Sequence, residues 1–359
     1  QLMDTDILDQ TKADAFADRM LNMLNEGALA LMSSLGHRTR LFDVMGGLPA
    51  STSEQIATAA GLNERYVREW LGAMVAGSIV EFDPEAETYH LPQEHAAFLV
   101  RTAAPDNMAV FAQYIPLLGT VEDQIVECFQ KGGGIPYSAF GRFHEVMAED
   151  SGQTVVAALM DSILPLVPGL MEDLERGIEV LDVGCGCGRA LNLMAKSFSA
   201  SRFTGYDFSK EAIATGQAAA QKQGLTNLRF EVKDVTSLDI TNHFQLITAF
   251  DAIHDQVYPD RVLKEIANAL DPDGTFLMQD IAASSHVHKN IDHPVGPLLY
   301  SISVMHCMTV SLAANGAGLG TMWGEEKARE MLQEAGFTKI DVKKLPHDFQ
   351  NAFYIIQKN

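Results

Sequence analysis

The stretch VLDVGCGCGR at residues 180–189 decides how the rest of the chain is interpreted. Before it, residues 178–183 form an apolar, largely β-branched run of strand length. After it, residues 189–197 have the composition and apolar spacing of a helix. Three glycines at alternate positions let the backbone turn sharply and approach a ligand with no Cβ atom in the way. A strand, a glycine-rich turn and a helix together predict a nucleotide-type binding site.

The glycine spacing and the acidic residues around it separate one class of nucleotide from another. The dinucleotide fingerprint G-x-G-x-x-G needs a glycine where this chain has Arg189, because the spacing here is G-x-G-x-G. Asp182 stands two positions before the first glycine, Asp207 closes the run RFTGYD, and Asp234 follows the run NLRFE. This order of motifs resembles the class I S-adenosylmethionine (SAM)-dependent methyltransferases. SAM carries a sulfonium and no phosphate, so carboxylates and open backbone suit it better than Arg and Lys.

The resemblance implies a position for each part of the cofactor. Asp182 and the glycine turn line the methionine side, Asp207 the ribose, and Asp234 with Val235 the adenine, while Phe250 flanks the sulfonium. The expected cofactor-binding residues are Tyr137, Asp182, Gly184, Cys185, Gly186, Gly188, Asp207, Phe208, Asp234, Val235 and Phe250. A glycine turn that serves packing alone is the competing interpretation.

Composition disfavours several other classes of protein. The chain has 359 residues, a net charge of −21 and a pI near 4.8, which disfavours nucleic acid and anionic membranes as partners. The four cysteines show neither a disulfide framework nor zinc spacing. Without a recognisable signal peptide, they predict a reduced, cytoplasmic protein. The longest apolar stretch, residues 297–319, is interrupted by His306, Asn315 and several Ser and Gly, so no membrane span is predicted.

The first hundred residues predict a helical domain that contains a winged helix. Residues 6–35 carry apolar side chains at three- and four-residue steps, typical of one or two helices. Thr52 and Asn63 stand where they cap two short helices separated by a turn at Gly61. Residues 79–82 and 89–91 then predict a small hairpin.

A winged helix can bind DNA, but the charges in this one oppose it. Arg65 and Arg68 of the second helix are balanced by Glu64 and Glu69. The wing carries four acidic residues, Glu81, Asp83, Glu85 and Glu87. The domain instead resembles the N-terminal dimerisation domain of small-molecule O-methyltransferases, which implies a homodimer and no nucleic-acid partner.

From residue 178 onward strands and helices alternate, which predicts an α/β fold with a doubly wound sheet. The expected strands are residues 178–183, 202–207, 227–232, 244–250, 274–280, 338–344 and 352–357. The last two are joined by residues 346–351 alone, too short for a parallel crossover, so the final strand should be antiparallel. The Rossmann-like, seven-stranded sheet of the methyltransferase family has the same reversed last strand.

The chain therefore divides into three expected parts. These are a winged-helix dimerisation domain (1–105), a helical linker covering the active site (106–175), and a SAM-binding methyltransferase domain (176–359) with an acceptor-pocket insertion (281–324). In the linker, residues 106–120 and 121–130 have helical periodicity, and the segment KGGGIPY at 131–137 breaks it. The resemblance places this loop over the methionyl end of SAM, with Tyr137 as its functional residue. Phe140 and Phe143 suit either an apolar cover or core packing.

The loop FDAIHDQ at residues 250–256 supplies the expected catalytic residues. Ligands of open α/β sheets bind outside the carboxyl ends of strands, so this loop faces the same crevice as the glycine turn. His254-Asp255 resembles the His-Asp pair of winged-helix O-methyltransferases, whose histidine is the general base. The plant-type motif continues with tryptophan, where this chain has Gln256. An imidazole titrates near neutrality and can remove the acceptor's proton. The alternatives are that His254 has a structural role in the loop or that it contacts SAM directly.

Residues 281–324 form a long insertion of the kind that walls an acceptor pocket. Its Met and aromatic content predicts an apolar pocket with few polar anchors. The expected acceptor-binding residues are Tyr300, His306 and Trp323. No metal is predicted, because no carboxylate-rich ligand set recurs with the three loop histidines, His286, His288 and His293.

Together these features predict a SAM-dependent methyltransferase that transfers a methyl group to a hydroxyl of a small or medium hydrophobic molecule and releases S-adenosylhomocysteine. Nitrogen and carbon acceptors remain alternatives. Three other classes share parts of the pattern: a SAM-responsive winged-helix transcriptional regulator, an NAD-dependent dehydrogenase, and a SAM-binding domain that has lost catalysis. The acidic wing disfavours the regulator, and the glycine spacing disfavours the dehydrogenase. The His254-Asp255 loop disfavours a domain without catalysis.

Overall fold

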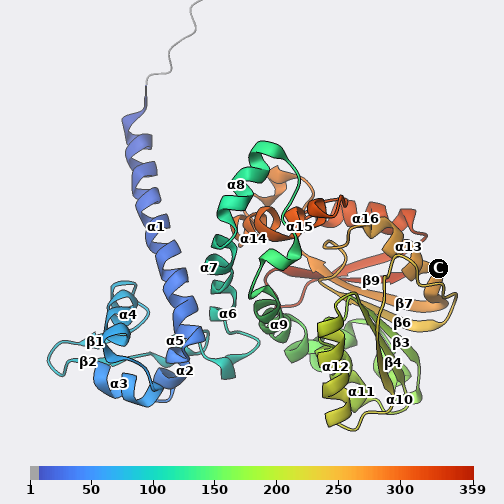
Figure 1. The fold of residues 1–359 in the computed structure, drawn as a ribbon, viewed down its shortest axis with the longest axis horizontal. Helices are drawn as coiled ribbons and strands as arrows, with labels where there is room; N and C mark the ends of the chain where they lie inside the picture. Colours follow the sequence, from blue (N-terminus) through green and yellow to red (C-terminus); the bar gives the residue numbers. More distant parts are fainter. Residues whose placement is uncertain (1–7) are drawn as a thin grey trace, which may run out of the picture. The chain divides into compact units, whose positions relative to one another are not determined.

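The computed structural model describes residues 8–359, which form two compact units, one that ends at Gly119 and one from Thr120 to Asn359 (Figure 1). Residues 6 and 7, at the start of the first expected helix, lie outside the described residues. The three-part division with boundaries near residues 105 and 175 stays a prediction.

The first unit contains the helix-turn-helix and wing that the sequence predicts. Thr52 caps helix α3 (Ser53–Ala60): its hydroxyl accepts the Gln55 N–H, and the Gln55 side chain accepts the Thr52 N–H. Asn63 caps α4 (Glu64–Ala76) in a similar way. The antiparallel pair β1 (Glu81–Asp83) and β2 (Thr88–His90) forms the wing.

The other helices of this unit are α1 (Gln10–Arg38), α2 (Leu41–Gly46), α5 (Gln93–Ala96), α6 (Ala109–Ala112) and α7 (Tyr114–Gly119). α1 is a single helix. The periodic segment expected to be helical up to residue 120 is instead broken into α6 and α7. Pro116 has no N–H to donate to Ala112, so one continuous helix would lose a hydrogen bond there.

The second unit is built on a seven-stranded sheet with the order β5-β4-β3-β6-β7-β9-β8. Its strands are β3 (Glu179–Val183), β4 (Arg202–Asp207), β5 (Leu228–Val232), β6 (Phe244–Phe250), β7 (Leu270–Ile281), β8 (Lys339–Lys343) and β9 (Asn351–Gln357). β3 to β7 pair in parallel, and β9 is antiparallel to both β7 and β8. The predicted α/β fold with a reversed final strand is therefore confirmed.

Alternate residues of each strand face opposite cores, which is why both faces of the sheet need helices. Val180, Leu246 and Leu277 point into one core with helices α10 (Leu170–Arg176), α11 (Arg189–Ser197) and α12 (Lys210–Lys222). Their neighbours Leu181, Ile247 and Met278 point into the other core with α13 (Pro259–Ala269) and α16 (Gly324–Glu334). This arrangement brings the carboxyl ends of the parallel strands to one edge of the unit.

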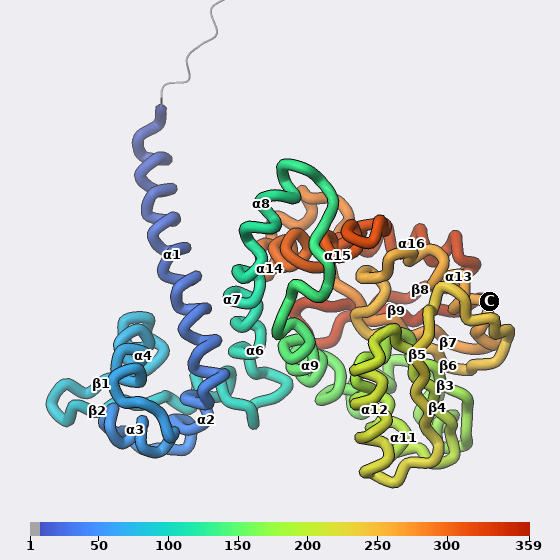
Figure 2. The backbone as a smooth tube through the Cα atoms, viewed as in Figure 1, coloured from blue at the N-terminus to red at the C-terminus, as the bar shows by residue number. Residues whose placement is uncertain are grey.

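Two segments outside the sheet lie at that edge. One contains α8 (Glu122–Lys131), the short 3-10 turn Tyr137–Ala139 and α9 (Phe143–Thr154). The other contains α14 (Gly296–Ile302), a π-helical turn Ser303–Cys307 and α15 (Met308–Ala313). The loop after α8 runs alongside α15 (Figure 2), where the Ile135 N–H donates to the Thr309 hydroxyl over 3.0 Å.

Among the described residues, one straight helix is long and apolar enough to cross a membrane. It is the run from α14 to α15. Gly296–Ala313 has a mean hydropathy of 1.3, and 44% of it is buried inside the structure. Its buried residues include the polar His306, Thr309 and Ser311.

Candidate functional site

The glycine turn between β3 and α11 leaves one open side. Gly184, Gly186 and Gly188 all have positive φ, at 70°, 52° and 66°. A Cβ atom on Gly188 would lie 2.3 Å from the Phe230 ring, so this glycine is required by packing. A Cβ atom on Gly186 would meet nothing within 4 Å. The middle of the turn therefore presents bare backbone to an open space, as a cofactor site requires.

Asp207, at the end of β4, connects this turn to the next loop. Its Oδ2 accepts the Gly186 N–H and its Oδ1 accepts the Ser209 N–H, each over 2.9 Å. The Phe208 ring beside it is 73% exposed. A carboxylate with remaining acceptor capacity and an exposed aromatic ring thus stand next to the open backbone of Gly186.

Asp182 has a different environment from Asp207. It is buried in β3, and its Oδ1 accepts the Thr248 hydroxyl of β6 over 2.8 Å. Burial, together with the negative charge of Asp207, raises the pKa of Asp182 to about 7. Asp182 therefore joins two strands beneath the turn.

Asp234, Val235 and Phe250 complete the expected cofactor side. Asp234 is largely exposed, and its Oδ1 accepts the backbone N–H and the hydroxyl of Thr236, which lower the pKa of Asp234. The Val235 side chain lies in the core, so only its backbone is available to a ligand. Phe250 ends β6 and is half-buried.

The loop that follows Phe250 touches the glycine turn. A Cβ atom on Gly184 would lie 2.7 Å from the Ala252 Cβ. The candidate cofactor site and the candidate catalytic loop are therefore adjacent, as expected from their places at the carboxyl ends of neighbouring strands.

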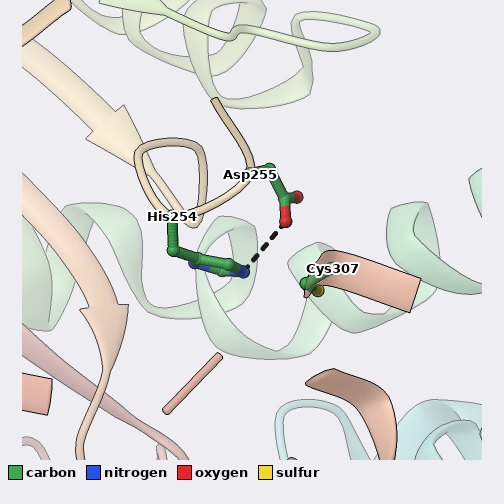
Figure 3. Close-up of side chains that lie close together, drawn as sticks. All are labelled: His254, Asp255 and Cys307. Atoms are coloured by element: carbon green, nitrogen blue, oxygen red, sulfur yellow. Dashed lines mark ion pairs between the residues drawn. The ribbon is translucent and has the colours of Figure 1, made fainter. Parts of the chain in front are cut away.

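His254 lies at the centre of a group of carboxylates. Its ring is 2% exposed. Nδ1 is 2.8 Å from Oδ1 of Asp280, and Nε2 is 3.1 Å from Oδ1 of Asp255. Oδ1 of Asp251 is 3.6 Å from Nδ1. Figure 3 shows the imidazole directed at the Asp255 carboxylate, with the Cys307 sulfur on the neighbouring segment.

These carboxylates control the protonation of His254. Burial by itself would lower the pKa of His254, but the charges of Asp280 and Asp255 outweigh it and raise the pKa well above its usual range. Burial likewise acts to raise the pKa of Asp255, yet the positive imidazolium lowers it to about 2. Burial raises the pKa of Asp251 well above its usual range, although His254 opposes this. These charges favour an imidazolium between two carboxylates.

Asp280 is a candidate functional residue that motif reasoning missed. It is fully buried at the end of β7, and its Oδ1 accepts from His254, from the Trp323 indole over 3.0 Å, and from the backbone N–H of Ile281. The sequence did contain a signal, since an acidic residue closing an apolar strand next to β6 reaches the same edge of the sheet.

A second buried histidine, His306, lies on the π-helical turn. Its ring stacks on Phe143, with centroids 3.4 Å apart and planes 6° from parallel, and touches Tyr137 and Phe140 edge-on. Neither ring nitrogen has a hydrogen-bond partner among the described residues. Burial lowers the pKa of His306 to about 4, despite the charge of Asp255. His306 is therefore neutral where His254 is charged.

Tyr137 contacts the rings of both His144 and His306 edge-on, with centroids 4.8 and 5.5 Å away. Its hydroxyl is 3.1 Å from Nδ1 of His144. Burial raises the pKa of Tyr137, and the charges of Asp255 and Asp207 raise it further.

The remaining insertion residues are separate from this cluster. The Tyr300 hydroxyl accepts from the Asn290 amide over 3.1 Å in a small apolar cluster of its own. Of the three loop histidines, His293 has Nε2 bonded to the Ala282 carbonyl and Nδ1 accepting the Val295 N–H, so it has no nitrogen left for a metal. His286 and His288 lie with ring centroids 5.8 Å apart.

Comparison with known families matches two separate parts of the chain to two different domains. Residues 27–101 match the Rv2258c-like winged HTH domain, and residues 174–336 match a methyltransferase domain.

Curated relatives match over about a third of the chain. The uncharacterized methyltransferase YcgJ of Bacillus subtilis is 32% identical over 102 residues, 28% of this chain and 40% of that protein. A fatty-acid O-methyltransferase of Mycolicibacterium smegmatis is 31% identical over 111 residues, 30% of this chain and 38% of that protein. The match to the polyketide synthase ThaQ of Burkholderia thailandensis, at 30% identity, covers 32% of this chain and 6% of that protein. The chain thus spans less than half the length of these relatives.

Solved structures match over nearly the whole chain. Human N-acetylserotonin methyltransferase in complex with SAM has a TM-score of 0.68 at 14% identity, covering 99% of this chain and 100% of that one. PigF with SAH has a TM-score of 0.69 at 17% identity, covering 98% and 100%. The mitomycin 7-O-methyltransferase MmcR has a TM-score of 0.68 at 16% identity, covering 97% and 99%. At these identities the similarity establishes the fold.

Proposed function

The chain is a class I methyltransferase with an N-terminal winged-helix domain, and from this premise we propose that it transfers the methyl group of SAM to a hydroxyl of a small or medium hydrophobic molecule. The observation that carries the proposal is the contact between the open glycine turn and the loop of His254. A methyl donor held at the turn has a proton-accepting group beside it, and methyl transfer to a hydroxyl needs both.

The cofactor side of the proposal is supported by the residues around Gly186. Asp207 accepts the two ribose hydroxyls, and Phe208 packs on the adenine, whose amino group donates to Asp234. The bare backbone from Gly184 to Gly188 takes the methionine portion, and Asp182 supports it from below. Tyr137 covers this end, and Phe250 flanks the sulfonium. No arginine or lysine is needed, because SAM lacks phosphate.

In the proposed reaction neutral His254 accepts the proton of the acceptor hydroxyl, so the imidazolium that Asp280 and Asp255 favour first loses its Nε2 proton to solvent. Asp280 holds Nδ1, so Nε2 is the nitrogen left for the acceptor, which enters beside Asp255. SAM supplies the activated methyl group, and the protein aligns the acceptor oxygen with it. Trp323 contributes by holding Asp280, which makes it a positioning residue.

His306 is the proposed polar anchor of the acceptor. Its two unpartnered nitrogens lie within an otherwise aromatic group, Tyr137, Phe140 and Phe143. A buried polar group without a partner is costly, so a ligand that supplies a hydrogen bond is favoured there. Tyr300 serves the wall of the pocket farther along the insertion.

We also propose that the protein is a homodimer joined through α1. This helix leaves a large set of apolar side chains more than a third exposed: Phe16, Met20, Leu21, Met23, Leu24, Leu31 and Leu35. Such a stripe is larger than scattered surface apolar residues explain. A second copy of the same helix is a self-complementary partner for it.

The first test is calorimetric titration of the protein with S-adenosylhomocysteine, with NAD as the control ligand. We expect saturable binding at micromolar affinity or tighter, about −8 kcal/mol, and no heat with NAD. Asp207→Asn should weaken this binding at least about tenfold, whereas Asp341→Asn on the edge strand β8 should not. No binding to a folded protein would contradict the proposal.

The second step uses SAM with a labelled methyl group and a panel of phenols, aliphatic alcohols, hydroxy fatty acids and amines. Mass spectrometry of the products then identifies the methylated atom. Exclusive transfer to nitrogen or carbon would overturn the O-methyl assignment while leaving the cofactor assignment intact.

A further inference from the structure

Three potential metal ligands of different chemistry converge beside the candidate base. Nε2 of His254, Oδ1 of Asp255 and the Cys307 sulfur all lie within 4.8 Å of one another (Figure 3). The first two come from the loop after β6, and Cys307 comes from the π-helical turn of the insertion. Sequence spacing gave no sign of this group, because Cys307 is remote from His254 in the chain.

We propose that these three residues form a site for one divalent ion of the Zn²⁺ class. Imidazole nitrogen, thiolate sulfur and carboxylate oxygen are the donors that zinc takes in proteins, and three protein ligands leave the fourth position open. Zinc-bound histidines nearly always donate their other N–H to a carboxylate. Asp280 already fills that role, since it accepts from Nδ1 of His254 over 2.8 Å.

The separations of the donor atoms suit an ion at their centre. Tetrahedral zinc with bonds of about 2.0–2.3 Å needs donor atoms about 3.3–3.6 Å apart. Nε2 and Oδ1 are 3.1 Å apart, and the sulfur needs to approach by at most about an ångström. An ion on the opposite side of the ring, between Asp251 and Asp280, would instead have to displace the hydrogen bond at Nδ1.

The local charges also favour a cation. Asp251, Asp255 and Asp280 have His254 as their only ion-pair partner among the described residues. Oδ2 of Asp280 is buried without a hydrogen bond in the described part of the chain. Buried carboxylate oxygens are normally paired or bound to metal.

Access to the site comes from the side of Asp255. The Asp255 side chain is 38% exposed, whereas the His254 ring and the Cys307 side chain are almost fully buried. An ion bound to Nε2 occupies the lone pair that would accept the acceptor's proton. The site therefore makes methyl transfer sensitive to zinc, a consequence that rests on the proposed function, whereas the binding itself does not.

The test is calorimetric titration of metal-stripped, reduced, tag-free protein with ZnCl₂, in the absence of SAM and acceptor. We expect the wild type to bind one equivalent of Zn²⁺. In Cys307→Ser and in Asp255→Asn this binding should be lost or at least about tenfold weaker. Cys128→Ser, a matched change on α8 outside the cluster, should bind like the wild type. The Co²⁺-loaded wild type should show a thiolate-to-cobalt absorption band that Cys307→Ser lacks.

Two results would overturn the site. One is a wild-type protein that binds no Zn²⁺. The other is binding that persists unchanged in both Cys307→Ser and Asp255→Asn, which would place the ion elsewhere, for instance at His286 and His288. Thermal unfolding and S-adenosylhomocysteine titration of each variant report folding and cofactor binding separately. A failure of the proposed function therefore cannot be mistaken for a failure of the zinc site.

Discussion

At the scale of single residues, two buried histidines differ in charge because their neighbours differ: His254 is charged and His306 is neutral. Asp280 and Asp255 raise the pKa of His254, whereas His306 lies among aromatic rings and burial lowers its pKa. The same side chain can thus serve as a charged centre or as a neutral hydrogen-bonding group within one site.

His254→Ala should abolish most of the methyl transfer to whichever acceptor the panel identifies. Removal of a general base typically costs a factor of about 10²–10⁴ in rate. The measurements are kcat with saturating acceptor and the calorimetric affinity for S-adenosylhomocysteine, which should be unchanged. His243→Ala, an exposed histidine of the same unit, is the control. Near wild-type turnover in His254→Ala would end the base assignment.

Asp182 should make stability depend on pH in the ligand-free protein. Burial raises the folded-state pKa of Asp182 to about 7, above the unfolded value of about 3.9, so the folded state holds the proton more tightly. Its contribution to the free energy of unfolding is therefore full below about pH 4 and is lost as the pH rises through 7, by up to about 1.4 kcal/mol per pH unit.

Asp182→Asn keeps an oxygen that accepts from Thr248 but cannot ionise. Urea unfolding of the two proteins at pH 5 and pH 8 should show the variant gaining stability relative to the wild type as the pH rises. A difference that is the same at both pH values would mean that Asp182 is already ionised in the folded protein.

At the scale of elements, the glycine turn combines two separate requirements. Gly188→Ala places a Cβ 2.3 Å from the Phe230 ring and should cost about 1–3 kcal/mol of stability from overpacking alone. Gly186→Ala meets no neighbour and should cost only the strain of its positive φ, about 1–2 kcal/mol.

The same pair of variants tests the cofactor site. In Gly186→Ala the added methyl group enters the open space, so the affinity for S-adenosylhomocysteine should fall more than the stability does. Urea unfolding and calorimetric titration of both variants separate the two effects. Unchanged affinity in Gly186→Ala would place the cofactor away from the middle of the turn.

Helix α1 offers a test of self-association. Leu24→Glu puts a charge within the exposed apolar stripe and should shift the protein from dimer to monomer in light scattering. Asn22→Glu adds the same charge on the opposite side of the helix and should leave the dimer intact. A wild-type monomer at micromolar concentration, or a Leu24→Glu dimer, would argue against α1 as the interface.

At the scale of the whole molecule, the net charge of −21 opposes a role in reading DNA. The helix α4 that a DNA-binding winged helix would insert has Arg65 paired with Glu69 and Arg68 paired with Glu64. Mixed genomic DNA should therefore keep its gel mobility at low salt with this protein present. A retarded band that disappears with added salt would revive the regulator hypothesis.

Much of the architecture follows from signals that are local in the chain. Strand length, the glycine turn and the caps at Thr52 and Asn63 each depend on a few consecutive residues. The reversed last strand follows from the short connection before β9, because a parallel crossover needs a dozen or more residues. The break between α6 and α7 was not predicted, since the apolar periodicity continues through Pro116.

The sequence by itself therefore determined the order of the elements, the sheet and the loops that carry the candidate chemistry. Only the tertiary structure decided what surrounds His254. Asp280 lies 26 residues from it in the chain, and Trp323 a further 43 residues on, yet one carboxylate oxygen accepts from both. Such contacts depend on how strands and helices pack across the sheet. Local periodicity records which face a residue is on, but not which distant side chain it meets there.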